Sequence, residues 1–219
     1  AYVVPSLIVA DVEEAARRAR EVEQAGLRWL ELNIGAPHAG EAPAGAIETG
    51  TELVAPIRQS VGIPLTVKVG GADPVTAARE AFAAGADVVC LTTRALGFLP
   101  DLRTRRPVLG TFGAIGGAWA LPITLAHVAK ARATLGAAAP LMATNGARDG
   151  LDVARSLLAG ASAVALTSAV ITDGASVLAR ALEQLHAYLE EQGVDAQDLV
   201  GEAADSVKTY EEVAMGRTR

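Results

Sequence analysis

Two patterns of apolar residues alternate along the chain. Short runs rich in β-branched residues predict strands at Val3–Val9, Trp29–Ile34, Pro64–Val69, Asp87–Thr92, Pro140–Ala143 and Ala163–Leu166. Between them, apolar residues at helical spacing predict helices at Asp11–Ala25, Thr51–Val61, Pro74–Ala84, Pro122–Leu135, Gly150–Ala159 and Ala175–Gln192. Such alternation is typical of a parallel sheet covered by helices, so the pattern predicts an α/β protein built from βα units.

Three segments repeat one another: "EQAGLRWLELN", "FAAGADVVCLT" and "LLAGASAVALT" each read as a helix end, a glycine and a buried strand. Gly26, Gly85 and Gly160 stand where helices commonly end, and Asp11 and Asp73 stand at N-cap positions. The repeat supports one continuous βα array.

A closed (β/α)8 TIM barrel has eight such units and typically ~250 residues. Six units are visible in these 219 residues, so either two are missing or the sheet is open. We expect a single domain over residues 1–219, because no linker divides the chain. The charged C-terminal region predicts a short helix from Asp195 to Ala204 and a frayed end.

Composition narrows the class of protein. A net charge of -6, with only Arg103, Arg105 and Arg106 as a basic cluster, argues against a nucleic-acid partner. Neither a secretory signal nor an apolar run long enough to cross a bilayer is visible, so we expect no membrane partner and a cytoplasmic location. The single cysteine, Cys90, fits a reducing compartment.

Polar residues cluster where the predicted strands end, the edge at which parallel α/β folds gather function. They are Glu31, Asn33, Lys68, Thr92, Thr93, Thr144, Asn145, Gly146, Thr167 and Ser168. Alternation along "PLTVKV" places Lys68 opposite the apolar face, inside the mouth of a barrel. A lysine there is suited to stabilise developing negative charge or to form a Schiff base, while a lysine that extends to solvent is the simpler alternative.

Two consecutive strand ends, in "ATNGARDG" and "LTSAV", offer small residues and free backbone N–H groups before a helix. In a barrel the last two such loops commonly bind a phosphate, which Asn145, Gly146, Thr167 and Ser168 are placed to do. A second glycine-rich segment, "GTFGAIGGAWALP" from Gly110 to Pro122, is long for a βα loop, and long loops are often functional.

Several of these segments together resemble a known family: "ELNIGAP", "VKV", "LTTRALG", "TRRPVLGTFGAIGG", "TNGARDGLDVARSLLAGASAVALTSAV" and "LEQLHAYLEEQG". They are similar to dihydroorotate dehydrogenases and related flavin barrels, including the flavin domain of dihydropyrimidine dehydrogenase. The resemblance implies a (β/α)8 barrel that binds FMN at the carboxyl ends of its strands. It also implies hydride transfer between the flavin and a pyrimidine-like ring.

The resemblance also implies residue roles. Lys68 would lie beside the pyrimidine edge of FMN and stabilise the reduced ring, and Asn33 would contact flavin and substrate. The other cofactor contacts it implies are Thr92, Thr93, Gly116, Gly117, Asn145, Gly146, Thr167 and Ser168. It implies no metal ligand.

Three departures from the family pattern stand out. The chain begins at the family's third barrel strand, so we expect the first two units to be missing from this sequence or supplied by a partner chain. The family's general base, Cys or Ser, is replaced by Ala36, while His38 and Thr92 stand where substrate-binding amides are expected. We hypothesise that His38 replaces the base or binds an anionic substrate, since an imidazole pKa near ~6.5 suits proton transfer. Cys90 is expected in the core.

The resulting functional prediction is an FMN-dependent oxidoreductase acting on a CH–CH bond of a small, cyclic, polar substrate. Two alternatives stay open: a flavin-free phosphate-binding barrel with Lys68 as Schiff-base lysine, and a degenerate flavin-binding subunit. We expect a small-molecule substrate and a homo-oligomer, with a partner subunit for electron transfer as a further option.

Overall fold

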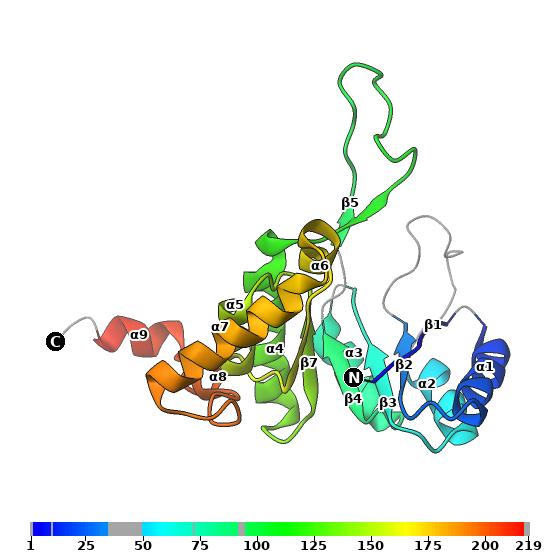
Figure 1. Cartoon of the computed structure of the whole chain (residues 1–219), viewed down its shortest axis with the longest axis horizontal. Coiled ribbons are helices and arrows are strands. Elements are labelled where there is room, and N and C mark those ends of the chain that lie inside the picture. Colours follow the sequence, from blue (N-terminus) through cyan, green and yellow to red (C-terminus); the bar gives the residue numbers. More distant parts are fainter. Residues whose placement is uncertain (1, 10, 35–49, 72, 92–94, 217–219) are drawn as a thin grey trace.

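A six-stranded parallel sheet forms the centre of the protein, in the computed structural model that describes residues 2–9, 11–34, 50–71, 73–91 and 95–216 (Figure 1). The strands follow the order β1-β2-β3-β4-β7-β8. Their bounds are β1 Ser6–Ile8, β2 Leu30–Asn33, β3 Leu65–Lys68, β4 Val88–Leu91, β7 Leu141–Thr144 and β8 Ala163–Ala165. The six predicted parallel strands are therefore confirmed, and five of them are shorter than the predicted apolar run.

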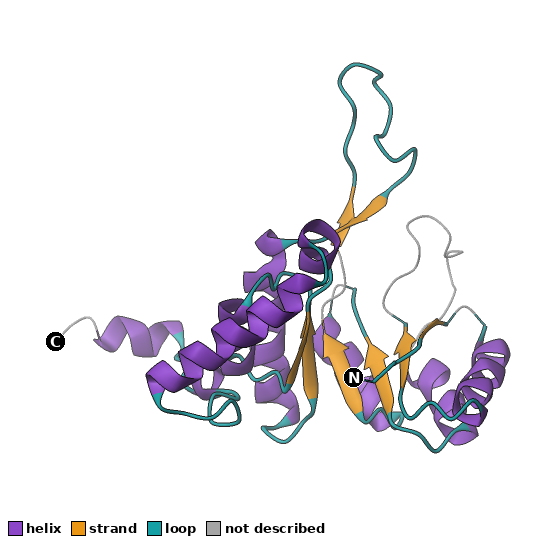
Figure 2. Cartoon of the chain, in the orientation of Figure 1, coloured by secondary structure: helices purple, strands orange, loops and turns teal. Residues whose placement is uncertain are grey.

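Helices follow the strands, and most of them pack on one face of the sheet (Figure 2). They are α1 Val12–Gln24, α2 Gly50–Ser60, α3 Pro74–Ala83, α4 Leu121–Leu135, α5 Gly150–Leu158, α6 Ser168–Asp173 and α7 Ser176–Gln192. Asp11 and Asp73 cap α1 and α3, accepting hydrogen bonds from the backbone N–H groups of Glu14 and Thr76. The six predicted helices are confirmed to within one or two residues at each end, and α6 was not predicted.

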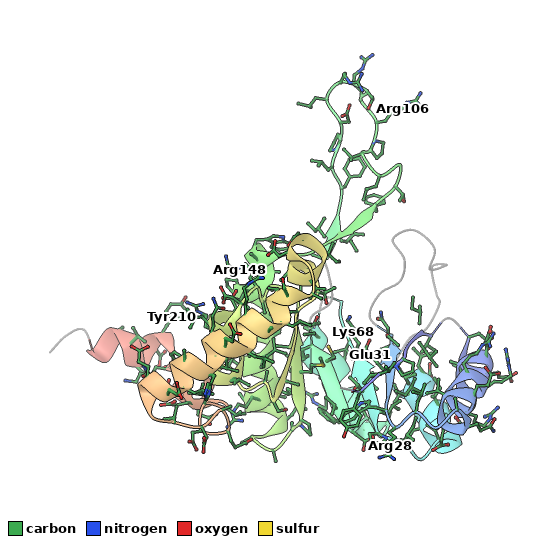
Figure 3. The ribbon with its side chains drawn as sticks, in the orientation of Figure 1. Arg28, Glu31, Lys68, Arg106, Arg148 and Tyr210 are labelled. Atoms are coloured by element: carbon green, nitrogen blue, oxygen red, sulfur yellow. The ribbon has the colours of Figure 1, made fainter. Side chains whose placement is uncertain are left out.

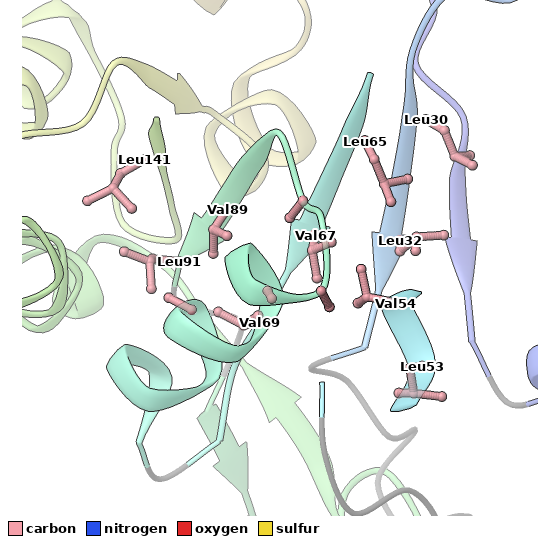
Figure 4. Packing of buried hydrophobic residues seen from close by; sticks show 14 of the residues in the cluster. Leu30, Leu32, Leu53, Val54, Leu65, Val67, Val69, Val89, Leu91 and Leu141 are labelled. Atoms are coloured by element: carbon pink, nitrogen blue, oxygen red, sulfur yellow. The ribbon is translucent and has the colours of Figure 1, made fainter. Parts of the chain in front are cut away.

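The main core lies between this face of the sheet and the helices (Figure 4). Its strand residues are almost entirely buried: Leu30, Leu32, Leu65, Val67, Val89, Leu91 and Leu141. Residues of α2 such as Leu53 and Val54 pack against them. We call this face of the sheet the covered face.

The opposite face, which we call the polar face, carries the alternate residues of the same strands. Strand register aligns Ile8, Asn33, Lys68, Cys90 and Met142 in one row across the sheet. Because successive side chains of a strand point to opposite faces, the buried leucines and valines of the covered face do not lie on the polar face.

A β-hairpin interrupts the path from β4 to α4. It consists of β5 Ala95–Gly97 and β6 Gly113–Ile115, paired antiparallel, and it stands away from the body of the molecule (Figure 1). The sequence predicts one long glycine-rich loop from Gly110 to Pro122. That prediction was wrong, because Gly110 to Pro122 forms a turn, β6, the 3₁₀ helix η1 Ala118–Ala120 and the start of α4.

The C-terminal region also differs from the prediction. Turns occupy most of residues 195–201, and the helices are α8 Glu202–Asp205 and α9 Tyr210–Gly216. Arg132 anchors α8 to α4, because its guanidinium pairs with the Asp205 carboxylate at 2.8 Å. A long-range ion pair of this kind leaves no local pattern in the sequence.

Candidate functional site

Asn33 and Lys68 end two neighbouring strands and are direct partners in the register of β2 and β3. The backbone of Ile34 donates a hydrogen bond to the Lys68 carbonyl oxygen at 3.1 Å, so the two strands stay paired beyond both residues. The two side chains share the polar face, as the alternation predicted. An amide and an ammonium therefore sit side by side at the carboxyl edge of the sheet.

The side-chain oxygen of Asn33, Oδ1, is buried and has no hydrogen-bond partner within the described residues. Buried polar atoms in native proteins are nearly always paired, and an unpaired one calls for an explanation. A ligand that donates a hydrogen bond at this edge is one such explanation. Asn33 is thus the residue at which the structure itself points to a binding site.

Glu31 lies one step below Asn33 on the same face, and Figure 3 shows it close to Lys68 on the neighbouring strand. Glu31 and Lys68 form no ion pair in the part of the chain that the structure describes. Glu31 instead accepts a hydrogen bond from the Ser6 hydroxyl at 2.6 Å, because register places it opposite Ser6 and Thr66.

Cys90 lies next to Lys68 in this row and is only 1% exposed. Burial raises the pKa of its thiol to about 12, an effect that the negative charge of Glu31 reinforces and the positive charge of Lys68 opposes. A thiol in this state is a poor nucleophile and a poor base at neutral pH. The expectation of a core cysteine is confirmed.

Asn145 joins two of the predicted cofactor loops. It has a left-handed backbone (φ 76°), and its side-chain oxygen accepts a hydrogen bond from the Gly117 N–H at 3.1 Å. Thr124 of α4 donates its hydroxyl to the Asn145 carbonyl oxygen at 2.8 Å. The loops that follow β6 and β7 are thereby fixed to each other and to α4.

Gly146 is required by close packing. Its φ is +114°, and a Cβ at this position would collide with the backbone of Leu121. Among the described residues, the backbone N–H groups of Gly146, Thr167 and Ser168 donate no hydrogen bond that the structure records. Gly146 follows β7, whereas Thr167 and Ser168 follow β8 and stand at the start of α6. Unpaired N–H donors and the positive end of a helix both favour the binding of an anion.

Gly116 and Gly117 follow β6 and precede η1, Gly116 exposed and Gly117 partly buried. A Cβ on Gly117 would meet only the Trp119 side chain, at 3.8 Å, so space is open beside it. Of the remaining predicted site residues, His38, Thr92 and Thr93 lie outside the described residues, as does Ala36.

One residue on the polar face was missed by sequence analysis. The indole of Trp29 donates a hydrogen bond to the hydroxyl of the buried Thr66 at 2.8 Å. The parity of Trp29 with Glu31 and Asn33 along the strand was the available signal, since residues two apart share a face. Trp29 covers the lower part of the polar face, below Lys68.

The described ranges contain neither a cluster of metal-ligating side chains nor a helix suited to cross a membrane. No group of three or more His, Cys, Asp or Glu side chains is placed there to hold a metal ion. No helix in those ranges combines the length and the apolar character that a membrane crossing requires.

Comparison with known proteins connects this geometry to one family. The sequence profile described as dihydroorotate dehydrogenase matches residues 3–189. Dihydroorotate dehydrogenase A (fumarate) from Lactobacillus helveticus is 32% identical over 195 residues, covering 84% of this chain and 62% of that protein. The catalytic subunit of dihydroorotate dehydrogenase B (NAD(+)) from Methanothermobacter thermautotrophicus is 30% identical over 211 residues, covering 92% and 69%.

Comparison with solved structures shows the fold class. A crystal structure of DHODH from Eimeria tenella in complex with ferulenol aligns with a TM-score of 0.67 at 19% identity, covering 85% of this chain and 57% of that one. This likeness confirms the predicted α/β TIM-barrel class. The chain spans about 62% of the length of the Lactobacillus helveticus relative. Since the family profile matches most of its residues, the protein belongs to the dihydroorotate dehydrogenase family.

Proposed function

We propose that this chain acts in an FMN-dependent oxidoreductase that transfers a hydride to or from a CH–CH bond of a small, cyclic, polar substrate. The observation that carries the proposal is the Asn33–Lys68 pair, with its unpartnered buried amide oxygen at the carboxyl edge of the sheet. Family membership supports the same reaction class. The dihydropyrimidine-type ring remains the preferred substrate class.

The residues present fit FMN. The amide of Asn33 offers both a donor and an acceptor to the polar edge of a flavin ring. The N–H groups of Gly146, Thr167 and Ser168 would bind the phosphate, and Asn145 holds the loop of Gly146 against that of Gly117. Gly116, Gly117, Thr92 and Thr93 complete the proposed contacts. FMN, when bound, supplies the hydride acceptor or donor.

Lys68 contributes charge to the proposed reaction. Its ammonium makes no ion pair with a described carboxylate, so it is available to stabilise the negative charge that accompanies reduction at the edge of the ring. His38 is proposed as the residue that moves a proton to or from the substrate, in place of the side chain that Ala36 lacks. Asn33, His38 and Thr92 would bind the substrate.

The cofactor is tested by titrating the full chain with FMN and following flavin fluorescence and absorption. We expect saturable binding, and we expect Lys68→Met to lower the midpoint potential of the bound flavin because the nearby positive charge is lost. Lys130→Met is the matched control, since Lys130 is exposed on α4. A chain that never binds FMN contradicts the proposal, and borohydride trapping of a carbonyl substrate on Lys68 would then favour the Schiff-base alternative.

The proton-transfer role is tested by steady-state turnover with dihydropyrimidine substrates and artificial electron acceptors. We expect His38→Ala to lower kcat at least tenfold without loss of bound FMN, and His186→Ala to have no effect, because His186 is an exposed helix residue. We expect Ala36→Cys to increase turnover of dihydroorotate. Equal activity of His38→Ala and His186→Ala would exclude His38 as the base.

We also propose a homo-oligomer and a cytoplasmic location. A partner subunit for electron transfer is supported by the relative from Methanothermobacter thermautotrophicus, which is named as a catalytic subunit. The chain has one cysteine, so an iron–sulfur centre for such a relay would lie on the partner.

A further inference from the structure

The first turn of α5 is engaged by side chains of the chain itself. The Gly150 N–H donates a hydrogen bond to Oε1 of Gln184 on α7 at 3.0 Å, and the Asp152 N–H donates to Oδ1 of Asp149 at 3.0 Å. A Cβ at position 150 would collide with the backbone of α7, so the two helices touch at this point. An anion bound after β7 is therefore better placed at Gly146, whose N–H donates no hydrogen bond to a described residue.

Asp152 of α5 holds two arginines with one buried carboxylate. Its side chain is fully buried, and its Oδ2 atom accepts hydrogen bonds from the backbone N–H and the Nε–H of Arg148, at 3.1 and 3.0 Å. Its Oδ1 atom accepts a hydrogen bond from Nη1 of Arg155 at 2.9 Å. A buried carboxylate needs such partners to offset its desolvation. Asp152 therefore fixes both the backbone and the side chain of Arg148 relative to α5.

The guanidinium of Arg148 is held at Nε and open at its outer end. Its Nη1 and Nη2 groups donate no hydrogen bond to any residue that the structure describes, and the side chain is 59% exposed. Arg148 follows Gly146 by two residues, and Figure 3 shows it at the edge of the body of the molecule toward which β7 runs. Arg155, by contrast, belongs to the last turn of α5 and uses Nη1 itself to reach the shared carboxylate.

A guanidinium held in this way is suited to bind a phosphate. Its two Nη groups lie in one rigid plane and can donate charge-assisted hydrogen bonds to two phosphate oxygens. Because Asp152 already restricts the side chain of Arg148, less conformational entropy is lost on binding. The charges of Arg148 and Arg155 balance those of Asp149 and Asp152, so directed hydrogen bonds rather than net charge would supply the affinity.

We propose that Arg148 binds the phosphate monoester of the ligand through Nη1 and Nη2, beside the N–H of Gly146, and that Asp152 is its positioning residue. The inference rests on the proposed function and deepens it, because FMN carries such a phosphate and riboflavin does not. Nothing in the sequence separates Arg148 from Arg155, since both are arginines near one aspartate. The hydrogen bond through Nε, which leaves the outer end of Arg148 open, is what separates them.

Fluorescence titrations with FMN and with riboflavin separate the phosphate contact from contacts with the ring. For Arg148→Met we expect FMN affinity to fall about tenfold or more, because charge-assisted hydrogen bonds are lost, while riboflavin affinity stays unchanged. Asp152→Asn should show part of the same selective loss. Arg155→Met is the matched control, since it removes the other arginine from the same carboxylate and should change neither affinity.

Circular dichroism confirms that the variants fold. Equal loss for FMN and riboflavin in Arg148→Met would show a merely structural role and overturn the proposal. Unchanged FMN affinity in Arg148→Met, or the same loss in Arg155→Met, would also overturn it.

Phosphate protection of the flavin-free chain tests the same contact without the cofactor. Phenylglyoxal modifies exposed arginines, and peptide mass spectrometry gives the rate at each one. We expect inorganic phosphate, compared with chloride at equal ionic strength, to slow modification of Arg148 about threefold or more and to leave Arg155 unchanged. Protection of Arg148 in a chain that binds no FMN would support the inference and reject the flavin proposal. Protection of neither arginine, or of both equally, overturns the inference whatever the result with FMN.

Discussion

The two faces of the central sheet are built from the same strands and carry opposite chemistry. The covered face presents leucine and valine side chains that are almost fully buried against the helices. The polar face presents Glu31, Asn33, Lys68 and the buried Cys90 in the register positions between them. Because strand side chains alternate, one four-residue strand contributes to both faces. The comparison indicates that the covered face mainly stabilises the fold and the polar face mainly carries the candidate site. A substitution on one face can therefore change stability or binding separately.

The largest expected effect belongs to the covered face. Leu65→Ala removes a side chain that is fully buried in the main core, and we expect it to lower the free energy of unfolding by about 2–5 kcal/mol. Urea denaturation measures this change. Leu96→Ala, at a residue 71% exposed in the hairpin, is the control and should stay within about 0.5 kcal/mol. Similar losses in both variants would show that the covered face is not the stabilising one.

The next effect lies on the polar face and depends on pH. Because the pKa of the folded Cys90 thiol is raised to about 12 from an ordinary value of 9.0, the unfolded chain loses this proton first as pH rises. Its stabilising contribution is complete below pH 9 and is lost between pH 9 and 12. Relative to Cys90→Ala, the wild type should lose about 1.4 kcal/mol per pH unit in that window. Parallel pH profiles of the two proteins would contradict the raised pKa.

Thr66 gives a smaller effect on the same face. Thr66→Val keeps the shape of a buried side chain but removes the acceptor of the Trp29 indole N–H, so we expect a loss of about 1 kcal/mol. Urea denaturation followed by tryptophan fluorescence measures it. Thr134→Val is the control, because Thr134 is exposed and its hydroxyl bonds only to the Lys130 carbonyl oxygen of its own helix. An unchanged midpoint for Thr66→Val would mean that water replaces the lost partner.

Local patterns made much of the fold predictable. Aspartate caps and terminal glycines marked helix ends, and Gly26, Gly85 and Gly160 do adopt positive φ angles. The period of two along β3 placed Lys68 on the polar face correctly. The hairpin escaped prediction because its two strands are three residues long and rich in glycine, so that pairing rather than propensity defines them.

The sequence predicted the edge of the sheet at which the candidate site lies, but not the contacts between its residues. The parallel order of the strands brings Asn33, Lys68, Gly146 and Thr167 to one edge, as strand–helix alternation implied. The bond from Gly117 to Asn145 joins residues 28 apart in sequence, and Glu31 pairs with Ser6 instead of Lys68. Such contacts depend on register and loop paths, which no local pattern specifies.

A substitution at Asn33 tests most directly whether the polar face serves binding and the covered face serves stability. It also has the smallest expected effect on the free energy of unfolding. Its Oδ1 atom is buried without a partner among the described residues, so it costs about 1–3 kcal/mol of desolvation that no hydrogen bond offsets. Asn33→Leu replaces it with an apolar group of similar size. We expect the free energy of unfolding of the flavin-free protein to stay the same or to rise by up to about 1 kcal/mol.

The same variant should bind FMN at least tenfold more weakly, because the amide that would pair with the ring is gone. Urea denaturation of the flavin-free protein and fluorescence titration with FMN give the two values independently. A protein that loses 2 kcal/mol or more would show that Asn33 serves the fold. Unchanged FMN affinity would remove it from the site. Equal or greater stability together with weaker FMN binding would mean that the polar face retains an unpaired amide in order to bind its ligand. The unpaired amide then lowers the free energy of unfolding, and the packing of the covered face compensates for that loss.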